Sequence, residues 1–458
     1  MSSGLTSGAD SAQPALPGGM GKVIGASLIG TTLEWYDFFI YGSSAALVFN
    51  ELFFPQFDPL IGTLLAFTTY AVGFVARPLG GVIFGHFGDR VGRKTILVIT
   101  LMIMGVATFL IGLLPTYESI GVLAPILLVT LRFLQGLGLG GEWGGAVLMV
   151  TEHGARGRRG YYGSWVQVGV PAGLLLANGV LAMLTATLSE QAFQSWGWRI
   201  PFLLSAVLIL VGLFIRVRIA ESPLFQEVEK TGTKARMPIV DVFRLYPRSI
   251  VTALFARIGV DIAFYTFVLF ILTYVTEQLD LSRATALNAV LLGSFLQLFL
   301  VPFFGGLSDR IGRRPVYLVG AAGALIWAFA FFALLDSRSP VLITVAAVGG
   351  LFWHAMMYGP QAAFIAELFG TRVRYSGASL GYQLAGIFGG ALAPIISVAL
   401  LARFGSTTPI SIYLAVALAL TIVAVSVARE TSRLDLEEAK AEERRIVEHP
   451  EAFRTAGG

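Results

Sequence analysis

Long apolar runs alternate with short polar turns along nearly the whole chain. Each run is close to or longer than the ~20 residues that an α-helix needs to cross the hydrocarbon core of a bilayer. Because unpaired backbone polar groups are costly in lipid, we expect every run to be helical. The pattern predicts twelve spanning helices, at residues 22–50, 58–85, 95–115, 121–151, 160–187, 197–216, 248–276, 284–306, 315–335, 340–366, 375–402 and 409–428.

Polar stretches between and beyond these runs divide the chain into parts. The longest internal stretch separates six predicted helices from six. We therefore expect an all-α membrane protein in which two six-helix halves, related by pseudo-symmetry, are joined by a linker. The predicted parts are a disordered tail at 1–21, a first bundle at 22–216, a linker at 217–247, a second bundle at 248–428 and a second tail at 429–458.

A short charged motif occurs twice and suggests that the two halves are related. GHFGDRVGRK at 85–94 and GGLSDRIGRR at 305–314 share the frame D-R-x-G-R, 220 residues apart. TEHGARGRRGYYGS at 151–164 and AELFGTRVRYSGAS at 366–379 repeat at an offset of 215. Repeats at nearly half the chain length indicate an internal duplication. In membrane proteins, bundles related in this way commonly enclose a site between them.

Composition excludes several classes of protein. Hydrophobic residues make up 55% of the chain and charged residues 13%, too few for an ordinary soluble surface. Cysteine is absent, which excludes disulfide bonds and thiolate metal sites. The glycine run at 136–141 follows no predicted strand, so it does not indicate a dinucleotide loop. We expect no cofactor, no metal, no nucleic-acid partner and no catalytic residues.

Basic residues are distributed unevenly among the predicted loops. The even-numbered loops contain 18 Lys and Arg residues, whereas the odd-numbered loops contain 3. Loops rich in Lys and Arg remain on the cytoplasmic side of a membrane. The first residues are small and polar, without the basic and apolar regions of a secretory signal peptide. We expect a multi-pass protein of the cell membrane with both termini in the cytoplasm.

Ionisable side chains inside the predicted helices are the first candidates for function, because burying them in lipid is costly. Glu34 and Asp37 share one helix face and lie near mid-depth. Arg132 lies at a similar depth in the fourth predicted helix, so we expect it to pair with one of these acids. Such a pair predicts a proton switch, since desolvation raises a carboxylate pKa while a nearby arginine lowers it.

Other polar side chains share this depth and predict a polar site between the halves. The alternative for Arg77 is that it pairs with an acid of the first predicted helix instead of binding a substrate anion. The alternative for Arg257 and Asp261, four residues apart, is an internal ion pair. The alternative for His354 is a structural hydrogen bond rather than a proton relay, and the glutamines can equally join helices. The candidate ligands are Tyr41, Arg77, Gln135, Gln167, Arg257, Asp261, Tyr265, Gln297, His354, Tyr358, Gln361, Tyr382 and Gln383.

Several stretches resemble a known family. The motif at 85–94 is similar to the hallmark loop of the major facilitator superfamily. Further stretches resemble its metabolite:proton symporters, which include permeases for shikimate, 2-oxoglutarate, citrate and proline or betaine. These stretches are LEWYDFFIYG at 33–42, ARPLGGVIFGHFGDRVGRK at 76–94, LRFLQGLGLGGEWGG at 131–145, WGWRIPFLLS at 196–205, RIAESPLF at 218–225 and MYGPQAAFIAELFGTRVRYSGASLGYQLA at 357–385.

The resemblance implies a proton-coupled symporter that imports a small organic metabolite and works as a monomer in the bilayer. It also implies that the arginine of R-x-x-Q-G, Arg132, lies beside a central cavity with a coupling role. The three membrane arginines favour an organic anion, while the acids permit a zwitterion such as proline or betaine. A sensing protein of the same fold without net transport is the alternative from a different class.

The repeated motif has a predicted role of its own. We expect Asp89 and Asp309 to face the N-terminal ends of helices in the opposite half and to latch the cytoplasmic side. The expected ion pairs within each half are Arg93 with Glu152 and Arg313 with Glu367. The alternative is that the motif only supplies topogenic positive charge. The candidate latch residues are Gly85, Asp89, Arg90, Gly92, Arg93, Glu152, Asp309, Arg310, Arg313 and Glu367.

Overall fold

The computed structural model describes residues 19–91, 93–140, 157–218, 239–370 and 374–432, and these residues are helical with short connections. The first half contains α1 Gly19–Leu47, α2 Phe49–Phe53, α3 Pro59–Val91, α4 Arg93–Leu113, α5 Tyr117–Ile120, α6 Leu123–Leu139, α8 Arg159–Thr187, α9 Glu190–Ser195, the 3₁₀ turn η1 Gly197–Arg199 and α10 Ile200–Arg218. The second half contains α12 Ile239–Leu245, α13 Pro247–Tyr265, α14 Ile271–Thr273, α15 Arg283–Ile311, α16 Arg313–Asp336, α17 Pro340–Glu367, α18 Arg374–Ala385, α19 Leu392–Phe404 and α20 Thr408–Val427.

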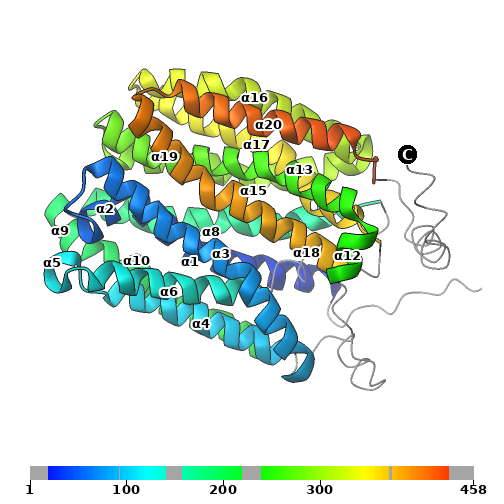
Figure 1. The fold of residues 1–458 in the computed structure, drawn as a ribbon, viewed down its shortest axis with the longest axis horizontal. Coiled ribbons are helices and arrows are strands. Elements are labelled where there is room, and N and C mark those ends of the chain that lie inside the picture. Colours follow the sequence, from blue (N-terminus) through cyan, green and yellow to red (C-terminus); the bar gives the residue numbers. More distant parts are fainter. Residues whose placement is uncertain (1–18, 92, 141–156, 219–238, 371–373, 433–458) are drawn as a thin grey trace, which may run out of the picture.

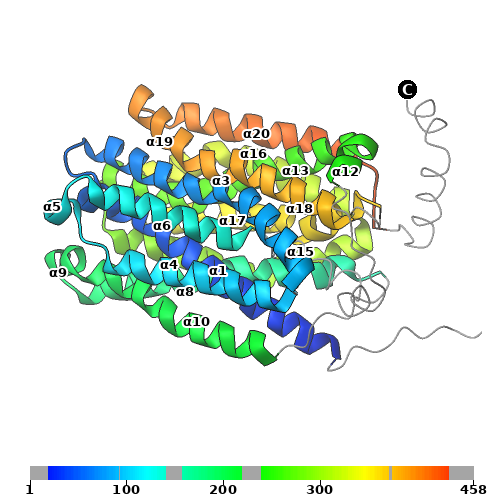
Figure 2. The ribbon, with the colours of Figure 1, turned by 60° about the horizontal axis from the view of Figure 1, so that its bottom comes forward.

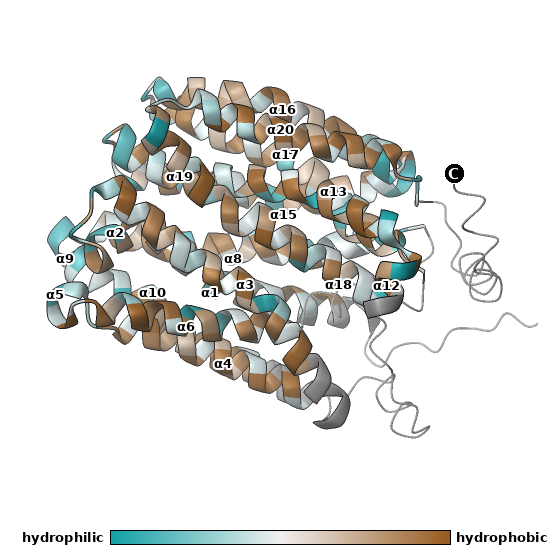
Figure 3. Ribbon diagram, viewed as in Figure 1, coloured by the Kyte–Doolittle hydropathy of each residue, from teal (hydrophilic) through white to brown (hydrophobic). Residues whose placement is uncertain are grey.

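The helices have the length and composition of membrane spans. Nine helices of the described residues are long and apolar enough to cross a bilayer, and two shorter apolar helices cover Val98–Leu113 and Leu123–Leu139. Their apolar residues extend along the length of the bundle, while polar residues gather at its two ends (Figure 3). Figure 1 shows α2, α5 and α9 at one end and α12 at the other, and Figure 2 shows the same separation of α5 and α9 from α12. The fold class predicted from the hydrophobic pattern is confirmed.

Two spans contain π-helical segments that the apolar pattern did not reveal. The span after Pro247 passes through η2 at Thr266–Phe270 and η3 at Tyr274–Gln278. The span after Arg374 passes through η4 at Gly386–Ala391. An extra residue in one helical turn is a common feature of functional sites, because it reorients the side chains that follow. All three segments lie in the second half.

The turn within the repeated motif is shorter than the sequence pattern predicted. α3 continues to Val91 and α4 begins at Arg93, and α15 likewise continues to Ile311 before α16 begins at Arg313. In the second copy, Gly312 alone makes the turn, with φ of 106°. Most L-residues are strained at such a positive φ, so the turn requires glycine. Most of the charged residues of the motif therefore lie on the last and first turns of helices.

Other boundaries differ from the prediction by a few residues. The first tail was expected to end at 21, yet α1 begins at Gly19; the linker was expected at 217–247, yet it contains α12. Within the predicted second tail, residues 429–432 are described and contact the second half. The predicted fourth span, 121–151, is described only as α6 and its following turn, and the rest lies outside the described residues.

The halves approach most closely where α8 of the first meets α15 of the second. Both helices present glycine at the contact. A methyl group on Gly160 would lie 2.5 Å from the carbonyl oxygen of Gly305, and one on Gly305 would lie 2.7 Å from that of Gly160 and 2.6 Å from Cβ of Ser164. No Cβ atom can occupy such positions unless a helix moves. The two glycines therefore determine how closely the halves pack at this end.

We expect Gly305→Ala to lower the melting temperature of the protein in detergent, because the added methyl group overlaps the backbone of α8. Overpacking of this kind costs about 1–3 kcal/mol. The matched control is Gly306→Ala, since a methyl group there would lie 3.4 Å from the ring of Tyr161, a tolerable contact. Equal melting temperatures for the two variants would contradict this account.

Candidate functional site

Arg77 of α3 lies at the interface between the halves with its charge held by aromatic rings. The side chain is 3% exposed. Its guanidinium carbon lies 4.3 Å from the centroid of the Phe38 ring and 4.6 Å from that of Phe74. Ring faces attract cations, which offsets part of the cost of burial. Among the described residues, neither Nε nor Nη2 of Arg77 has a hydrogen-bond acceptor.

Arg257 of α13 is the second buried arginine of this interface and belongs to the opposite half. Its Nε donates to Oδ2 of Asp261 at 2.9 Å, so the internal ion pair that was the alternative prediction is formed. The guanidinium also lies over the ring of Tyr382. Nevertheless Nη1 of Arg257 is buried and has no partner within the described part of the chain. The ion pair therefore occupies only part of its donor capacity.

Tyr265 brings the two arginines to one place. It follows Arg257 and Asp261 on α13, and its ring centroid lies 5.9 Å from that of Phe74 on α3. A methyl group at Gly390 of η4 would lie 2.7 Å from Phe74 and 2.8 Å from Tyr265, so η4 packs directly on this contact. Arg77, one turn after Phe74 on α3, and Arg257, two turns before Tyr265 on α13, thus approach this contact from opposite halves. The interface thus contains two buried cations with unused N–H groups.

Arg132 does not form the expected ion pair with the acids of α1. Its Nη1 donates to Oε1 of Gln135, one turn along α6, and its Nε lies 3.4 Å from the carbonyl oxygen of Tyr70. The rings of Phe38, Tyr41 and Tyr70 surround the guanidinium. Neighbouring acceptors and aromatic faces thus stabilise the cation in part without a direct carboxylate, while its Nη2 is buried without an acceptor among the described residues. The expectation of a contact ion pair was wrong.

The acids of α1 nevertheless lie beside Arg132. Glu34 and Asp37 are 9% and 3% exposed, and Oδ1 of Asp37 is buried without a partner in the described residues. Together with Arg132 they line a narrow crevice of the first half, whose walls are Glu34, Asp37, Phe38, Met104, Arg132, Gln135, Gly136 and Leu139. Gln135 also donates to Oγ1 of Thr108 at 2.7 Å, a contact that helical spacing could not predict. A proton on Asp37 would change the charge next to Arg132.

Several other predicted ligands are already bound to protein groups. The ring nitrogen Nδ1 of His354 lies 2.8 Å from Nε2 of Gln297, which also donates to the carbonyl oxygen of Leu351. His354 stacks on Tyr358, whose ring centroid lies 4.9 Å away. The remaining bonds of this kind are Tyr41 to Thr69, Gln361 to Tyr317 and Gln383 to the carbonyl oxygen of Gly140. Gln167 is buried at 1% exposure. These contacts match the structural alternative for the histidine and the glutamines.

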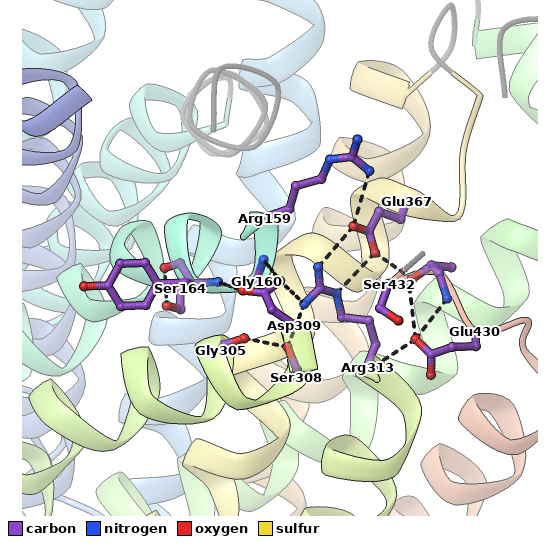
Figure 4. Close-up of polar contacts among 12 residues, drawn as sticks. Arg159, Gly160, Ser164, Gly305, Ser308, Asp309, Arg313, Glu367, Glu430 and Ser432 are labelled. Atoms are coloured by element: carbon purple, nitrogen blue, oxygen red, sulfur yellow. Dashed lines mark hydrogen bonds and ion pairs between the residues drawn. The ribbon is translucent and has the colours of Figure 1, made fainter. Parts of the chain in front are cut away.

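A second site lies at the end of the bundle where the repeated motif occurs (Figure 4). Asp309 of α15 accepts two hydrogen bonds from the first turn of α8: Oδ1 from the backbone N–H of Gly160 at 2.9 Å and Oδ2 from that of Tyr161 at 2.8 Å. The carboxylate thus caps a helix of the opposite half. Such a placement is favourable because the free N–H groups give a helix N-terminus a partial positive charge.

Arg313 holds this carboxylate in place. Its Nη1 donates to Oδ1 of Asp309 at 2.7 Å, and its Nε lies 3.3 Å from Oε2 of Glu367, the pair that the sequence predicted. Nη1 of Arg159 in the first half lies 3.9 Å from Oε1 of Glu367. One network of charges therefore joins α8, α15, α16 and α17 across the two halves. We name these four side chains, Arg159, Asp309, Arg313 and Glu367, the Asp309 network.

The segment after α20 adds two residues that the sequence prediction missed. Glu430 accepts hydrogen bonds from the backbone N–H groups of Arg313 at 2.8 Å and Arg314 at 3.0 Å, and Thr431 donates to Glu367 at 2.6 Å. Partial burial acts to raise the pKa of Glu430, but bonds from backbone N–H groups outweigh it and hold that pKa below its usual value. No periodicity marks these residues, because they follow the last helix.

The first copy of the motif cannot be compared in the same detail. Gly85, Asp89, Arg90 and Arg93 lie on α3 and α4, but their side chains are outside the described residues, as are Gly92 and Glu152 entirely. In the second copy, Arg310 is exposed, and among the described contacts it forms no ion pair with the other half. The structure thus separates Asp309, which bonds the other half, and Arg313, which holds Asp309, from Arg310, which is exposed.

The fold and the two sites define a class: a membrane transporter built of two related helical halves. Two family models match the chain, "Sugar (and other) transporter" over residues 22–241 and "Major Facilitator Superfamily" over residues 253–456. The chain is 41% identical over 420 residues to the inner membrane metabolite transport protein YhjE of Escherichia coli K12, covering 91% of this chain and 95% of that protein. The chain belongs to the major facilitator superfamily, among its metabolite transporters.

Further relatives indicate the range of the family. The shikimate transporter of E. coli K12 is 43% identical over 392 residues, 85% of this chain and 90% of its own length. The proline/betaine transporter of the same organism is 34% identical over 386 residues, 81% of this chain and 76% of its own. A structure of the proton:xylose symporter XylE superposes with a TM-score of 0.70 at 16% identity, covering 92% of this chain and 98% of that one, and supports the fold alone. The predicted family is confirmed, and these relatives are transporters rather than enzymes.

We expect Asp309→Asn to open the Asp309 end, because the neutral amide loses the charge that faces the N-terminus of α8. A loss of about 1.4 kcal/mol would change the ratio of closed to open molecules tenfold. Electron–electron resonance between spin labels at the exposed positions Thr95→Cys and Ser426→Cys measures this ratio, and the chain has no native cysteine to interfere. Arg310→Gln is the control: it removes a charge from the same turn and should leave the distances unchanged. If the distance distribution is the same in Asp309→Asn as in the wild type, the motif is no latch and only supplies the positive charge that sets the orientation in the membrane.

Proposed function

We propose that this chain is a proton-coupled symporter that imports a small organic anion. The substrate carboxylate binds between Arg77 of the first half and Arg257 of the second. The Asp309 end faces the cytoplasm, as the distribution of basic loops predicts, and both termini lie on that side. The two halves expose the arginines to one side of the membrane at a time.

The observation that carries this proposal is the pair of buried guanidinium groups with unused N–H donors. A buried donor without an acceptor is unfavourable, and an arginine fork matches a carboxylate in geometry as well as in charge. Binding a carboxylate would supply the missing acceptors of Arg77 and Arg257 at once. Because the two residues come from opposite halves, the bound anion would also draw the halves together.

A zwitterion is less well matched by the same interface. Its cationic group would need a free carboxylate near the two arginines, yet Asp261 is already bound to Arg257 at 2.9 Å. The hydroxyl groups of Tyr70 and Tyr265 border the interface and suit the hydroxyl or keto oxygen of an organic acid. One relative is a shikimate transporter, and shikimate is an organic acid of this kind. Another relative is a proline/betaine transporter, which agrees with the zwitterion alternative.

Proton coupling is assigned to Asp37, with Glu34 beside it and Arg132 as the responding charge. Asp37 is almost fully buried in the first half and has an acceptor atom without a donor. A proton on that atom would remove the carboxylate charge next to Arg132. The guanidinium would then depend more strongly on its other contacts, among them the backbone of α3, which also carries Arg77. This connects the proton site to the substrate site through a single helix.

Arg77→Lys should weaken binding of an organic anion roughly tenfold to a hundredfold, because lysine loses the planar fork that bonds both carboxylate oxygens. Thermal stabilisation by a panel of organic acids and zwitterions measures affinity without requiring transport. Arg199→Lys is the matched control, since the hydrogen bonds of Arg199 within the described residues go to backbone carbonyl oxygens, those of Gly112 and Leu114, away from this interface. Unchanged affinity in Arg77→Lys, or stabilisation by zwitterions alone, would exclude the anion site.

Asp37→Asn should abolish accumulation of substrate against its gradient in proteoliposomes and leave substrate counterflow intact, because exchange needs no net proton movement. The control is Glu118→Gln, which changes an exposed acid of α5 at the end of the bundle opposite the Asp309 network. Normal accumulation by Asp37→Asn under a pH gradient would overturn the assignment. A wild-type protein that binds the acid but transports none would instead favour the sensing alternative.

A further inference from the structure

Glu277 joins the two halves at the end of the bundle opposite the Asp309 network. It belongs to η3 of the second half. Oγ1 of Thr63 in α3 donates to its Oε1 at 2.7 Å, and Nδ2 of Asn50 in α2 donates to the same oxygen at 3.3 Å. Both donors come from the first half and both are buried. Both hydrogen bonds from the first half to Glu277 are therefore accepted by the same carboxyl oxygen, Oε1.

The second carboxyl oxygen of Glu277 and the amide oxygen of Asn50 both lack a hydrogen-bond partner. Within the described residues, Oε2 of Glu277 and Oδ1 of Asn50 are both buried without a hydrogen bond. Two acceptors cannot bond to one another. A protonated carboxyl group, however, has an O–H donor on one oxygen and an acceptor on the other, which complements the acceptor and donor of an amide. The two unsatisfied atoms are the ones that a single added proton could join.

The charges around Glu277 oppose its ionised form. Glu51 of α2 and Asp58, which precedes α3, repel a carboxylate at this position, and Arg283 of α15 attracts it. Arg283 is engaged elsewhere: it donates to the carbonyl oxygen of Leu47 at 3.1 Å and pairs with Glu51 at 3.6 Å and with Glu190 of α9. Arg283, the cation near Glu277 in the described part of the chain, is thus shared among other acceptors of the first half.

We propose that Glu277 is a proton-binding group that, once protonated on Oε2, forms a two-bond acid–amide pair with Asn50. In that pair Nδ2 of Asn50 donates to Oε1, and Oε2–H donates to Oδ1 of Asn50. Deprotonation leaves the bonds from Thr63 and Asn50 to Oε1, removes the bond from Oε2 to Asn50, and sets Oε2 against Oδ1 of Asn50 as two repelling oxygens. The proton therefore closes this end of the bundle, and its release opens it.

In the transport cycle this site would sense the proton on the outer side. The inference rests on the proposed function for that role, because the orientation in the membrane comes from there. The acid–amide pair itself depends only on Glu277, Asn50 and Thr63. If Glu277 must be protonated before the outer end closes, a carrier that has bound substrate but no proton cannot close. It therefore cannot complete the transport cycle. It would act alongside Asp37, which lies within the first half rather than between the halves.

The test follows the distance between the halves at this end in the absence of substrate. Spin labels at the exposed positions Ser119→Cys and Ser337→Cys report the separation of the first and second halves. We expect the full-length protein in lipid nanodiscs to move towards the short distance as the buffer is acidified. Glu277→Gln should show the short distance in acid and in alkaline buffer alike, because a glutamine amide supplies both the donor and the acceptor of the pair.

Two further variants separate this site from its neighbours. Asn50→Ala should remove the response to pH, since the partner of the carboxyl group is gone. Glu190→Gln, at an exposed acid of the same end that bonds Arg283, should keep it. A wild-type protein without a pH response overturns the proposal. So does a response that persists in Glu277→Gln or Asn50→Ala, or one that disappears in Glu190→Gln. No substrate is present, so these outcomes are independent of the proposed transport activity.

Discussion

The contact on which the arrangement of the halves depends is the carboxylate of Asp309 on the first turn of α8. It satisfies two backbone N–H groups that a helix cannot bond internally, and its charge complements the helix dipole, an interaction of about 0.3–1 kcal/mol when exposed and up to ~2 kcal/mol when partly buried. The bond is possible only because Gly160 and Gly305 let the two backbones approach. Arg313, itself bonded to Glu367, then fixes the carboxylate.

A transporter needs such contacts to be breakable, and the described residues join the halves at both ends. At one end the Asp309 network bridges α8 and the second half. At the other, Arg283 and Glu277 of the second half bond to α2, α3, α9 and the end of α1. Each bridge contains only a few charge-assisted bonds among the described residues. A difference of a few kcal/mol between the two ends is therefore enough to decide which one opens.

The arginines of the interior are stabilised in an unusual way. Aromatic rings surround the guanidinium groups of Arg77 and Arg132, while a carboxylate pairs with Arg257. Ring faces compensate a buried cation only in part, because they accept no conventional hydrogen bond. Arg77 and Arg257 are thus held in place but retain free donors. That combination suits a site that must bind an anion and release it again.

The sequence by itself determined the helices, their approximate limits and the relation of the halves, because crossing a bilayer requires long apolar helices and a repeated motif marks the duplication. It also placed Asp309 and Arg313 in the correct role of helix cap and partner of Glu367. Only the tertiary structure decided which side chains meet. Arg132 bonds Gln135 rather than Asp37, Gln297 is occupied by His354, and Glu430 and Glu277 became visible as partners of distant segments. Helical spacing states which residues share a face, but the rotation of one helix against another depends on packing of glycines and rings contributed by the whole chain.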